Sequence, residues 1–193
     1  MPGDLSILAA RRTVRFYTPD AVPDDVVRAL LEAASLAPSA HNAQAARFII
    51  IRSPELRRRL TARMSRRWRR DLERAGTSEA AIRVQLRFSE RRFGQAPLLI
   101  LVGYTLEDMD EYPDRARRAA EATMASQSAA AATQNLLLAA AAYGLGSCWT
   151  CAPLFCPGIV RRALDLPASL VPQALLTIGY PAHTPPMPPR KPI

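Results

Sequence analysis

The amino-acid sequence predicts an α+β domain with few strands and many helices. Three apolar runs bounded by turn residues have the composition of buried strands, at 47–52, 98–104 and 173–180. Between them lie stretches with helical spacing, and the alanine-rich stretch at 112–146 is long enough to cross the domain. Because no internal repeat or linker composition interrupts this order, the whole chain, residues 1–193, is predicted to form a single domain.

The first predicted helix follows Asp20 and Pro23, residue types that commonly begin helices. Its apolar residues recur with the i, i+3/i+4 spacing of one buried face, at Val26, Val27, Leu30, Leu31 and Ala34. Pro38 ends this helix, and the β-branched run "RFIIIR" at 47–52 then predicts a buried strand.

Residues 55–92 form an arginine-rich helical insert with thirteen arginines and five acidic residues. Ser53 and Pro54 are placed as the cap and first residue of its first helix. Apolar residues recur every four positions along that helix, at Leu56, Leu60, Met64, Trp68 and Leu72. Arginines surrounding such a narrow stripe are typical of a solvated helix, and a basic rim over a substrate pocket is the other interpretation.

The second half of the chain alternates strands and helices. The run "LLILVGY" at 98–104 predicts a buried strand, and the long helix that follows is apolar on nearly all sides after Ser126, as in a central helix. The segment "SCWTCAPLF" reads as a strand or strand-like loop, and a short helix with Pro157 near its start follows it. After the strand at 173–180, residues 181–193 hold six of the seventeen prolines, so we expect an extended tail.

The net charge of +9 comes almost entirely from arginine, since Lys191 is the only lysine. Such a balance allows nucleic-acid binding, and it equally suits an enzyme whose ligands bear phosphate or carboxylate groups. A basic nucleic-acid-binding module therefore stays as an alternative from another functional class.

No membrane span is expected. The best apolar window, "SAAAATQNLLLAAAAYGLG", contains Gln134 and Asn135 and reads better as a buried core helix. The N-terminus lacks a basic region followed by an apolar one, so no secretory signal is expected and a cytoplasmic location follows as the default.

No metal site is expected either. Cys148, Cys151 and Cys156 fall in one apolar stretch, where small buried side chains are the favoured interpretation. A zinc site would need a fourth ligand, and neither His41 nor His183 has ligand spacing around it.

Two short motifs could bind a ligand. "RRTVR" at 11–15 places three guanidiniums and a hydroxyl within five residues, and alternate side chains of an extended segment share one face. "PSAHNAQ" at 38–44 places short polar groups on a loop after a helix. The first could instead be a solvated basic segment, and in the second Ser39 and Asn42 could simply satisfy the backbone of a turn. We assign no catalytic role to His41.

Taken together, "RRTVR", the "PSAHNAQ" loop leading into a strand, "GLGSCWTCAP", and "IGYP" with the basic tail "PRKP" resemble the nitroreductase family of flavoproteins. The match covers roughly residues 10–52 and 97–193 and leaves the arginine-rich insert poorly matched. The resemblance implies a three-layer α/β/α sandwich with a mixed sheet and a long central helix. It also implies FMN bound between the two subunits of a homodimer that completes the domain.

Carried over residue by residue, the resemblance assigns Arg11, Arg12, Thr13 and Arg15 to the phosphate, ribityl chain and pyrimidine edge of the flavin. Residues of the second motif would meet the flavin from the other subunit, namely Pro38, Ser39, Ala40 and Asn42. Thr150, Cys151 and Ala152 would lie beside the flavin N5 edge, and Arg190, with Lys191 as its neighbour, would return to the phosphate. Because the flavin carries the redox chemistry, no catalytic side chain is expected.

Two further details bear on the activity. Where many relatives have Pro-Trp, this chain has Ala45-Ala46, which changes packing or pocket size. The stretch from 110 to 157 is similar to the flavin domain associated with the γ-glutamyl ligase of coenzyme F420. The resemblance thus implies two-electron, ping-pong transfer through flavin N5 to a small organic acceptor. That acceptor would be a dehydro precursor of F420 or, alternatively, a nitroaromatic or quinone reduced with NAD(P)H.

Overall fold

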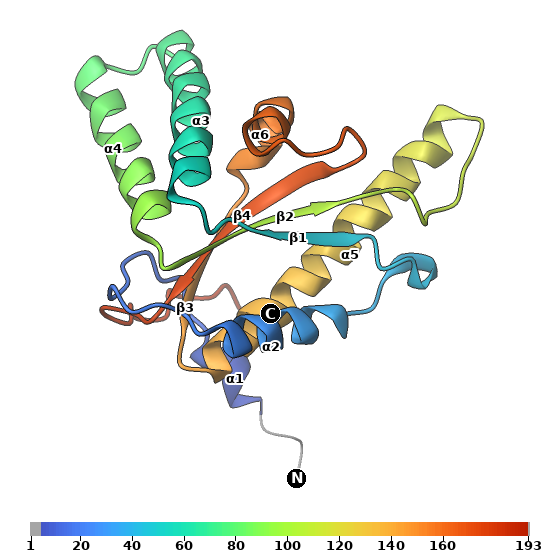
Figure 1. The fold of residues 1–193 in the computed structure, drawn as a ribbon, viewed down its shortest axis with the longest axis horizontal. Coiled ribbons are helices and arrows are strands. Elements are labelled where there is room, and N and C mark those ends of the chain that lie inside the picture. The colour runs from blue at the N-terminus through green and yellow to red at the C-terminus, as the bar shows by residue number, and fades with distance from the viewer. Residues whose placement is uncertain (1–4, 193) are drawn as a thin grey trace.

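The computed structural model describes residues 5–192, so residues 1–4 and 193 of the predicted domain lie outside the described part of the chain. Helices and strands alternate along it in the order expected from the sequence (Figure 1). The elements are α1 (Ser6–Ala10), α2 (Asp24–Ser35), η1 (Ala40–Asn42), β1 (Ala46–Ile50), α3 (Pro54–Arg74), α4 (Glu79–Gln95), β2 (Leu98–Tyr104), α5 (Arg115–Ala142), β3 (Gly146–Thr150), η2 (Ala152–Phe155), α6 (Pro157–Leu164) and β4 (Val171–Gly179).

The four strands form one sheet in the order β1-β2-β4-β3, and every neighbouring pair is antiparallel. Among the described residues, the parallel pairing in this region is the isolated bridge between Thr13 and Ser147. The mixed character expected of the sheet therefore rests on that bridge alone, because the named strands pair antiparallel throughout.

Helices cover both faces of the sheet, which gives the expected three layers (Figure 1). On one face α2 and α5 pack on alternate strand residues such as Ile100 and Leu176. On the other face α3, α4 and α6 pack on the intervening residues, among them Leu101 and Leu175. All seven residues of β2 are buried, as a strand covered on both faces must be.

The predicted helix starts are confirmed at the arginine-rich insert. The Ser53 hydroxyl accepts a hydrogen bond from the Leu56 N–H at 3.2 Å, and Pro54 opens α3. Ser78 caps α4 in the same way through the Ala81 N–H. The insert is thus a pair of packed helices, α3 and α4, that covers one end of the sheet (Figure 1).

The central helix α5 buries less of its surface than the sequence predicted. Its buried residues form one stripe, at Glu121, Ala125, Ser128, Ala129, Ala132, Thr133, Leu136, Leu137 and Ala140. Asn135 donates to the Ala33 carbonyl of α2 at 3.2 Å, whereas Gln134 is exposed. The opposite face keeps Ala130, Leu138 and Ala141 only half-buried, so the expectation that this helix is packed all round is not met within one chain.

Two local differences from the sequence expectations are clear. Helix α1 was not expected, and it is a five-residue turn without buried residues that gave no periodic signal. The segment "SCWTCAPLF", expected as a strand or strand-like loop, is a strand only as far as Thr150, and the chain then turns into η2, where Pro153 lacks a backbone donor.

The N-terminal basic segment is held against the edge of the sheet. We call residues 11–18 the basic arm. Thr13 bridges to Ser147, and the Val14 N–H donates to the Ser147 carbonyl at 2.9 Å. Val14 packs over Gly146, where an added Cβ would lie 2.6 Å from the Val14 Cβ. The close approach of the basic arm to β3 therefore requires glycine at position 146.

We expect Gly146→Ala to lower the free energy of unfolding by about 1–3 kcal/mol, because the new methyl group has to displace Val14. Urea denaturation monitored by circular dichroism measures this change. The matched control is Gly94→Ala in α4, where an added Cβ has no neighbour within 4 Å. The control should be neutral or stabilising by up to about 1 kcal/mol, since alanine favours a helix interior. Equal effects of the two substitutions would contradict this packing argument.

Candidate flavin site

The basic arm lies between β3 and the start of the C-terminal tail. Beyond the bridge to Ser147, Tyr17 pairs with Pro181 and the Ala182 N–H donates to the Phe16 carbonyl at 3.1 Å. The arm therefore fills the space between two segments from the second half of the chain. This pairing fixes its backbone while its arginine side chains lie at the surface.

Tyr17 fastens the arm to the sheet. Its hydroxyl lies 2.7 Å from the Val14 carbonyl and 2.8 Å from the Thr177 carbonyl of β4. Burial raises the pKa of Tyr17 well above its ordinary value. The sequence argument did not single out this residue, because nothing in "RFYTP" shows which residue will face the sheet.

The arginines of the basic arm do not share one environment. Arg12 turns back and donates to the carbonyls of Ala9 and Arg11, so it closes the end of α1. Arg11 and Arg15 have no hydrogen-bond partner or ion pair for their side chains among residues 5–192. Two free guanidiniums on one fixed segment are suited to binding an anion.

A largely apolar cavity of about 510 Å³ opens between the insert and the end of β3. Thr150, Cys151 and Ala152, the residues expected beside a flavin, form one wall. The wall contributed by α3 and α4 includes Met64, Trp68, Ser89, Arg92 and Phe93. The structure therefore joins the insert, which matched the family poorly, to the predicted site as the roof of its cavity.

Arg92 of α4 is a site candidate that the sequence argument missed. It lines both this cavity and a smaller one of about 180 Å³ that it shares with Arg15 and Tyr17. Its Nε is buried without a hydrogen-bond partner, and its guanidinium lies 4.7 Å from the centre of the Phe93 ring. Burial is the main cause that lowers the pKa of Arg92, and the nearby charge of Arg15 lowers it further. A half-buried cation whose buried Nε has no acceptor is a position that an anion would stabilise.

The loop at 38–44 has unusual backbone geometry. His41, Asn42 and Gln44 have φ angles of 54°, 52° and 48°, values that non-glycine residues seldom adopt. Such strain is concentrated at ligand-binding and interface segments. Although asparagine tolerates this conformation better than most residues, three such residues within four positions exceed the needs of an ordinary turn.

Some side chains of this loop form hydrogen bonds within the chain, and others have no partner in the described part of it. The Ser39 hydroxyl accepts from the Gln44 N–H at 3.0 Å, so Ser39 satisfies the loop itself, one of the two interpretations left open by the sequence. The Ala40 N–H donates to Ser128 of α5 at 3.1 Å. The Asn42 side chain is exposed and has no partner among the described residues. Pro38 and Ser39 line a small cavity of about 140 Å³ together with Ala46, where the family's bulk is missing.

The two predicted motifs lie far apart within one chain. Figure 1 shows η1 beside the first half of α5, whereas the basic arm lies beside β3 at the other end of the sheet. Arg15 shares a cavity with Arg92, and Arg92 also lines the cavity walled by Thr150, Cys151 and Ala152, but the chain does not bring Pro38, Ser39, Ala40 and Asn42 to them. Arg190, in the tail, is exposed and has no side-chain partner among residues 5–192.

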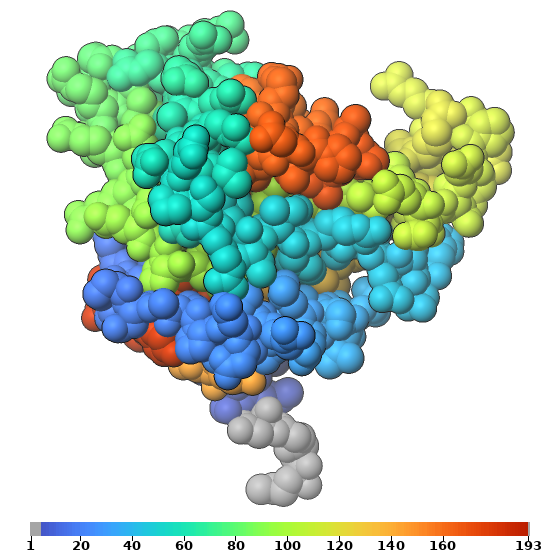
Figure 2. Space-filling model, viewed as in Figure 1, coloured from blue at the N-terminus to red at the C-terminus, as the bar shows by residue number. Residues whose placement is uncertain are grey.

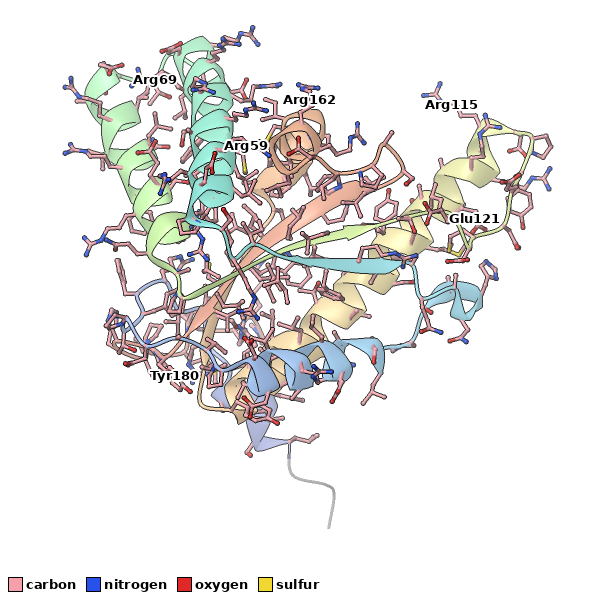
Figure 3. The ribbon with its side chains drawn as sticks, viewed as in Figure 1. Arg59, Arg69, Arg115, Glu121, Arg162 and Tyr180 are labelled. Carbon is pink, nitrogen blue, oxygen red and sulfur yellow. The ribbon has the colours of Figure 1, made fainter. Side chains whose placement is uncertain are left out.

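His41 has a carboxylate neighbour that sequence distance concealed. Its Nε2 lies 3.6 Å from Glu121 of α5, a residue only 4% exposed whose second carboxylate oxygen has no hydrogen-bond partner (Figure 3). Asp110 completes a group whose ligand atoms all lie within 4.8 Å of one another. No carboxylate stands beside His41 in the sequence, and the fold brings one to it from a helix eighty residues later in the chain.

Comparison with known proteins agrees with this architecture. The family model described as "Nitroreductase family" matches residues 8–180. An NADH dehydrogenase of Thermus thermophilus is 31% identical over 90% of this chain and 84% of its own length. A crystal structure described as a nitroreductase in complex with FMN, from Desulfovibrio desulfuricans, has a TM-score of 0.74 at 29% identity. That alignment covers 97% of this chain and 91% of the other.

The matching family model and the likeness to an FMN-bound structure show that the protein is an FMN-dependent oxidoreductase. The chain belongs to the nitroreductase family. Among the described residues, no helix has the length and apolar character needed to span a bilayer.

The residues present suit FMN. Its phosphate needs cationic donors, and Arg11, Arg15 and Arg92 provide guanidiniums that no carboxylate of the described chain neutralises. Its ring system needs an apolar slot with a few polar groups, which the cavity beside Thr150 and Cys151 provides.

We expect Tyr17→Phe to lower the free energy of unfolding at neutral pH by about 1–2 kcal/mol, because two carbonyls lose the hydroxyl. The folded protein holds the Tyr17 proton to higher pH than the unfolded chain does. The stability due to this group is therefore complete below about pH 10, the ordinary pKa of tyrosine, and falls as the pH rises above it.

Urea titrations between about pH 7 and pH 11 should accordingly show a steeper loss of stability for the wild type than for Tyr17→Phe. Tyr143→Phe is the control, since Tyr143 is 51% exposed and its substitution should leave the profile unchanged. Parallel profiles for the wild type and Tyr17→Phe would show that Tyr17 does not fasten the arm.

Proposed function

We propose that FMN binds with its phosphate and pyrimidine edge on the basic arm and its ring beside Thr150, Cys151 and Ala152. The observation that supports this proposal is that Arg92 lines both the cavity it shares with Arg15 of the arm and the cavity walled by Thr150, Cys151 and Ala152. Arg11 and Arg15 supply the positive charge. Thr13 contributes its backbone position, and Arg12 holds the arm's conformation through local carbonyls.

The second part of the proposal is a homodimer that completes each site. Pro38, Ser39, Ala40 and Asn42 lie too far from the arm in one chain, so a second copy has to bring them to the flavin. Two features support this arrangement, the half-buried apolar face of α5 and the strained loop with a free Asn42. Arg190, with Lys191, would reach the phosphate from the tail, and its lack of a partner within the described chain is compatible with this role.

Bound FMN would accept two electrons from a donor and deliver hydride from N5 to a small organic acceptor, in a ping-pong sequence. The protein's contribution is to bind the flavin, to orient it against the acceptor and to tune its reduction potential. A fixed cation near the pyrimidine edge stabilises the negative charge of the reduced ring, and the cavity roofed by Trp68 and Phe93 excludes water around a flat acceptor.

The acceptor is proposed to be a flat, largely apolar ring such as a quinone or nitroaromatic, reduced with NAD(P)H. A dehydro precursor of F420 is the second candidate, and the observation favouring it is the arginine-rich surface that borders the apolar cavity. Parallel assays of both acceptor types with NADH, NADPH and reduced FMN would separate the two. The nucleic-acid alternative rests on net charge alone, and it predicts colourless protein that binds DNA.

We expect Arg11→Ala to weaken FMN binding roughly tenfold to a hundredfold, the loss of one charge-assisted phosphate contact. The flavin absorbance band of purified protein and its titration with FMN measure the change. Arg28→Ala is the control, because Arg28 is exposed on α2 without a side-chain partner in the described structure. Unchanged flavin affinity in Arg11→Ala would refute the phosphate role of this residue.

A further inference from the structure

Helices α3 and α6 enclose a second cavity, of about 350 Å³, on the outer side of the insert. We call it the arginine cleft. It is lined by Arg63, Arg66, Arg67, Arg70, Ile159 and Arg162. No acidic residue lines it, although the insert as a whole contains five.

Helical spacing explains why these arginines meet. The four from α3 stand at positions i, i+3, i+4 and i+7, so they share one face of the helix. Arg162 faces them from α6, which packs directly against α3. Figure 2 shows the two helices in contact along this surface, and Figure 3 shows Arg162 on the exposed side of α6.

The two helices that form the cleft are joined by Arg59 and by Arg63, which itself lines the cleft. Arg59 donates to the Ala163 carbonyl at 2.6 Å and pairs with Asp165, and Arg63 donates to the Arg162 carbonyl at 3.0 Å. These contacts occupy carbonyls in the last turn of α6, where cations are favoured. The separation of α3 and α6 is therefore set by the chain itself before any ligand binds.

The charges inside the cleft are not balanced by the protein. Three of its arginines have neither an ion pair nor a side-chain hydrogen bond among residues 5–192, namely Arg66, Arg70 and Arg162. Arg67 forms a single ion pair, with Asp71. The contrast on the same helix is Arg69, which lies outside the cleft and pairs with both Glu73 and Glu79. Among the described residues, Asp71 is thus the one acid paired with an arginine that lines the cleft, so an anion in the cleft would relieve the repulsion between the remaining guanidiniums.

The arginine cleft borders the proposed substrate cavity. Arg67 lines both spaces, and the larger one has Thr150, Cys151 and Ala152 on its far wall. A ligand could place a ring in the apolar cavity while an attached anionic group reaches past Arg67.

We propose that the arginine cleft binds the phosphate groups of a phosphorylated redox substrate whose ring enters the apolar cavity. This inference rests on the proposed function, since it adds a recognition site to the same substrate path. Guanidiniums converging from two sides match the tetrahedral oxygens of a phosphate and bind it through paired hydrogen bonds. A short cleft with arginines on two sides suits a compact phosphate group better than the long, one-sided basic face that nucleic acid requires.

The test is isothermal titration of FMN-loaded protein with sodium tripolyphosphate. We expect binding at one site per chain, weakened at least tenfold by the double substitution Arg66→Gln with Arg70→Gln. The matched control is Arg58→Gln with Arg87→Gln, which removes the same charge from exposed positions outside the cleft. The control should change the affinity less than twofold. Absence of binding, or equal weakening in both double variants, would overturn the proposal.

Steady-state kinetics with an uncharged quinone then identify the source of the phosphate. A higher KM for NADPH or NADH in the cleft variant, and not in the control, assigns the phosphate to the donor. Unchanged KM values alongside lost tripolyphosphate binding assign it to the acceptor. A single-stranded DNA oligonucleotide that binds the cleft more tightly than tripolyphosphate would contradict the proposal.

The proposed flavin site and the proposed phosphate site can be refuted independently of each other. Wild-type protein that cannot be loaded with FMN would refute the flavin site, and the tripolyphosphate titration of that protein would still decide whether the cleft binds phosphate.

Discussion

The arrangement of the site depends on the close contact between the basic arm and the edge strand β3. Because Gly146 has no side chain, Val14 can lie directly on the strand, and the Val14 N–H can bond to Ser147. Tyr17 then ties the same segment to β4, and the tail packs on its outer side. Arg11 and Arg15 are thereby held on a fixed segment beside β3, and Arg15 shares a cavity with Arg92, which also lines the cavity at the end of β3. If this contact were lost, Arg11 and Arg15 would belong to a free N-terminal segment and could not form a fixed site for the flavin phosphate.

Much of the fold followed from local sequence patterns. The bounded β-branched runs gave β1, β2 and β4 to within two residues, and Ser53 with Pro54 marked the start of α3. Features that depend on residues far apart in the chain could not be predicted from the sequence. The antiparallel pairing of all four strands is a property of chain topology, and the pairing of His41 with Glu121 joins residues eighty positions apart. Arg92 looked like one more solvated arginine, since its burial depends on how α4 packs on the basic arm.

The insert is the part of the structure that changes the functional interpretation most. Its sequence matched the family poorly and suggested a solvated basic face. In the structure α3 and α4 close over Thr150 and Cys151, so the same helices give the apolar roof of one cavity and the arginine lining of another. The positive charge of this chain is therefore balanced in some places and left unbalanced in others. Part of it is neutralised within the insert, as at Arg69, and part is directed toward the substrate path.

The central claim is that each flavin site combines the basic arm of one chain with the 38–44 loop of another. Mixing two defective chains tests it directly. Arg11→Ala removes an arm cation, and Asn42→Gly removes the free amide without straining the left-handed backbone at that position. Each variant alone should bind little FMN. In mixed dimers, one of the two sites combines an intact arm with an intact loop. Random assortment should then restore roughly a quarter of the wild-type flavin content. Flavin content no higher than the average of the separate variants would contradict a site shared between chains.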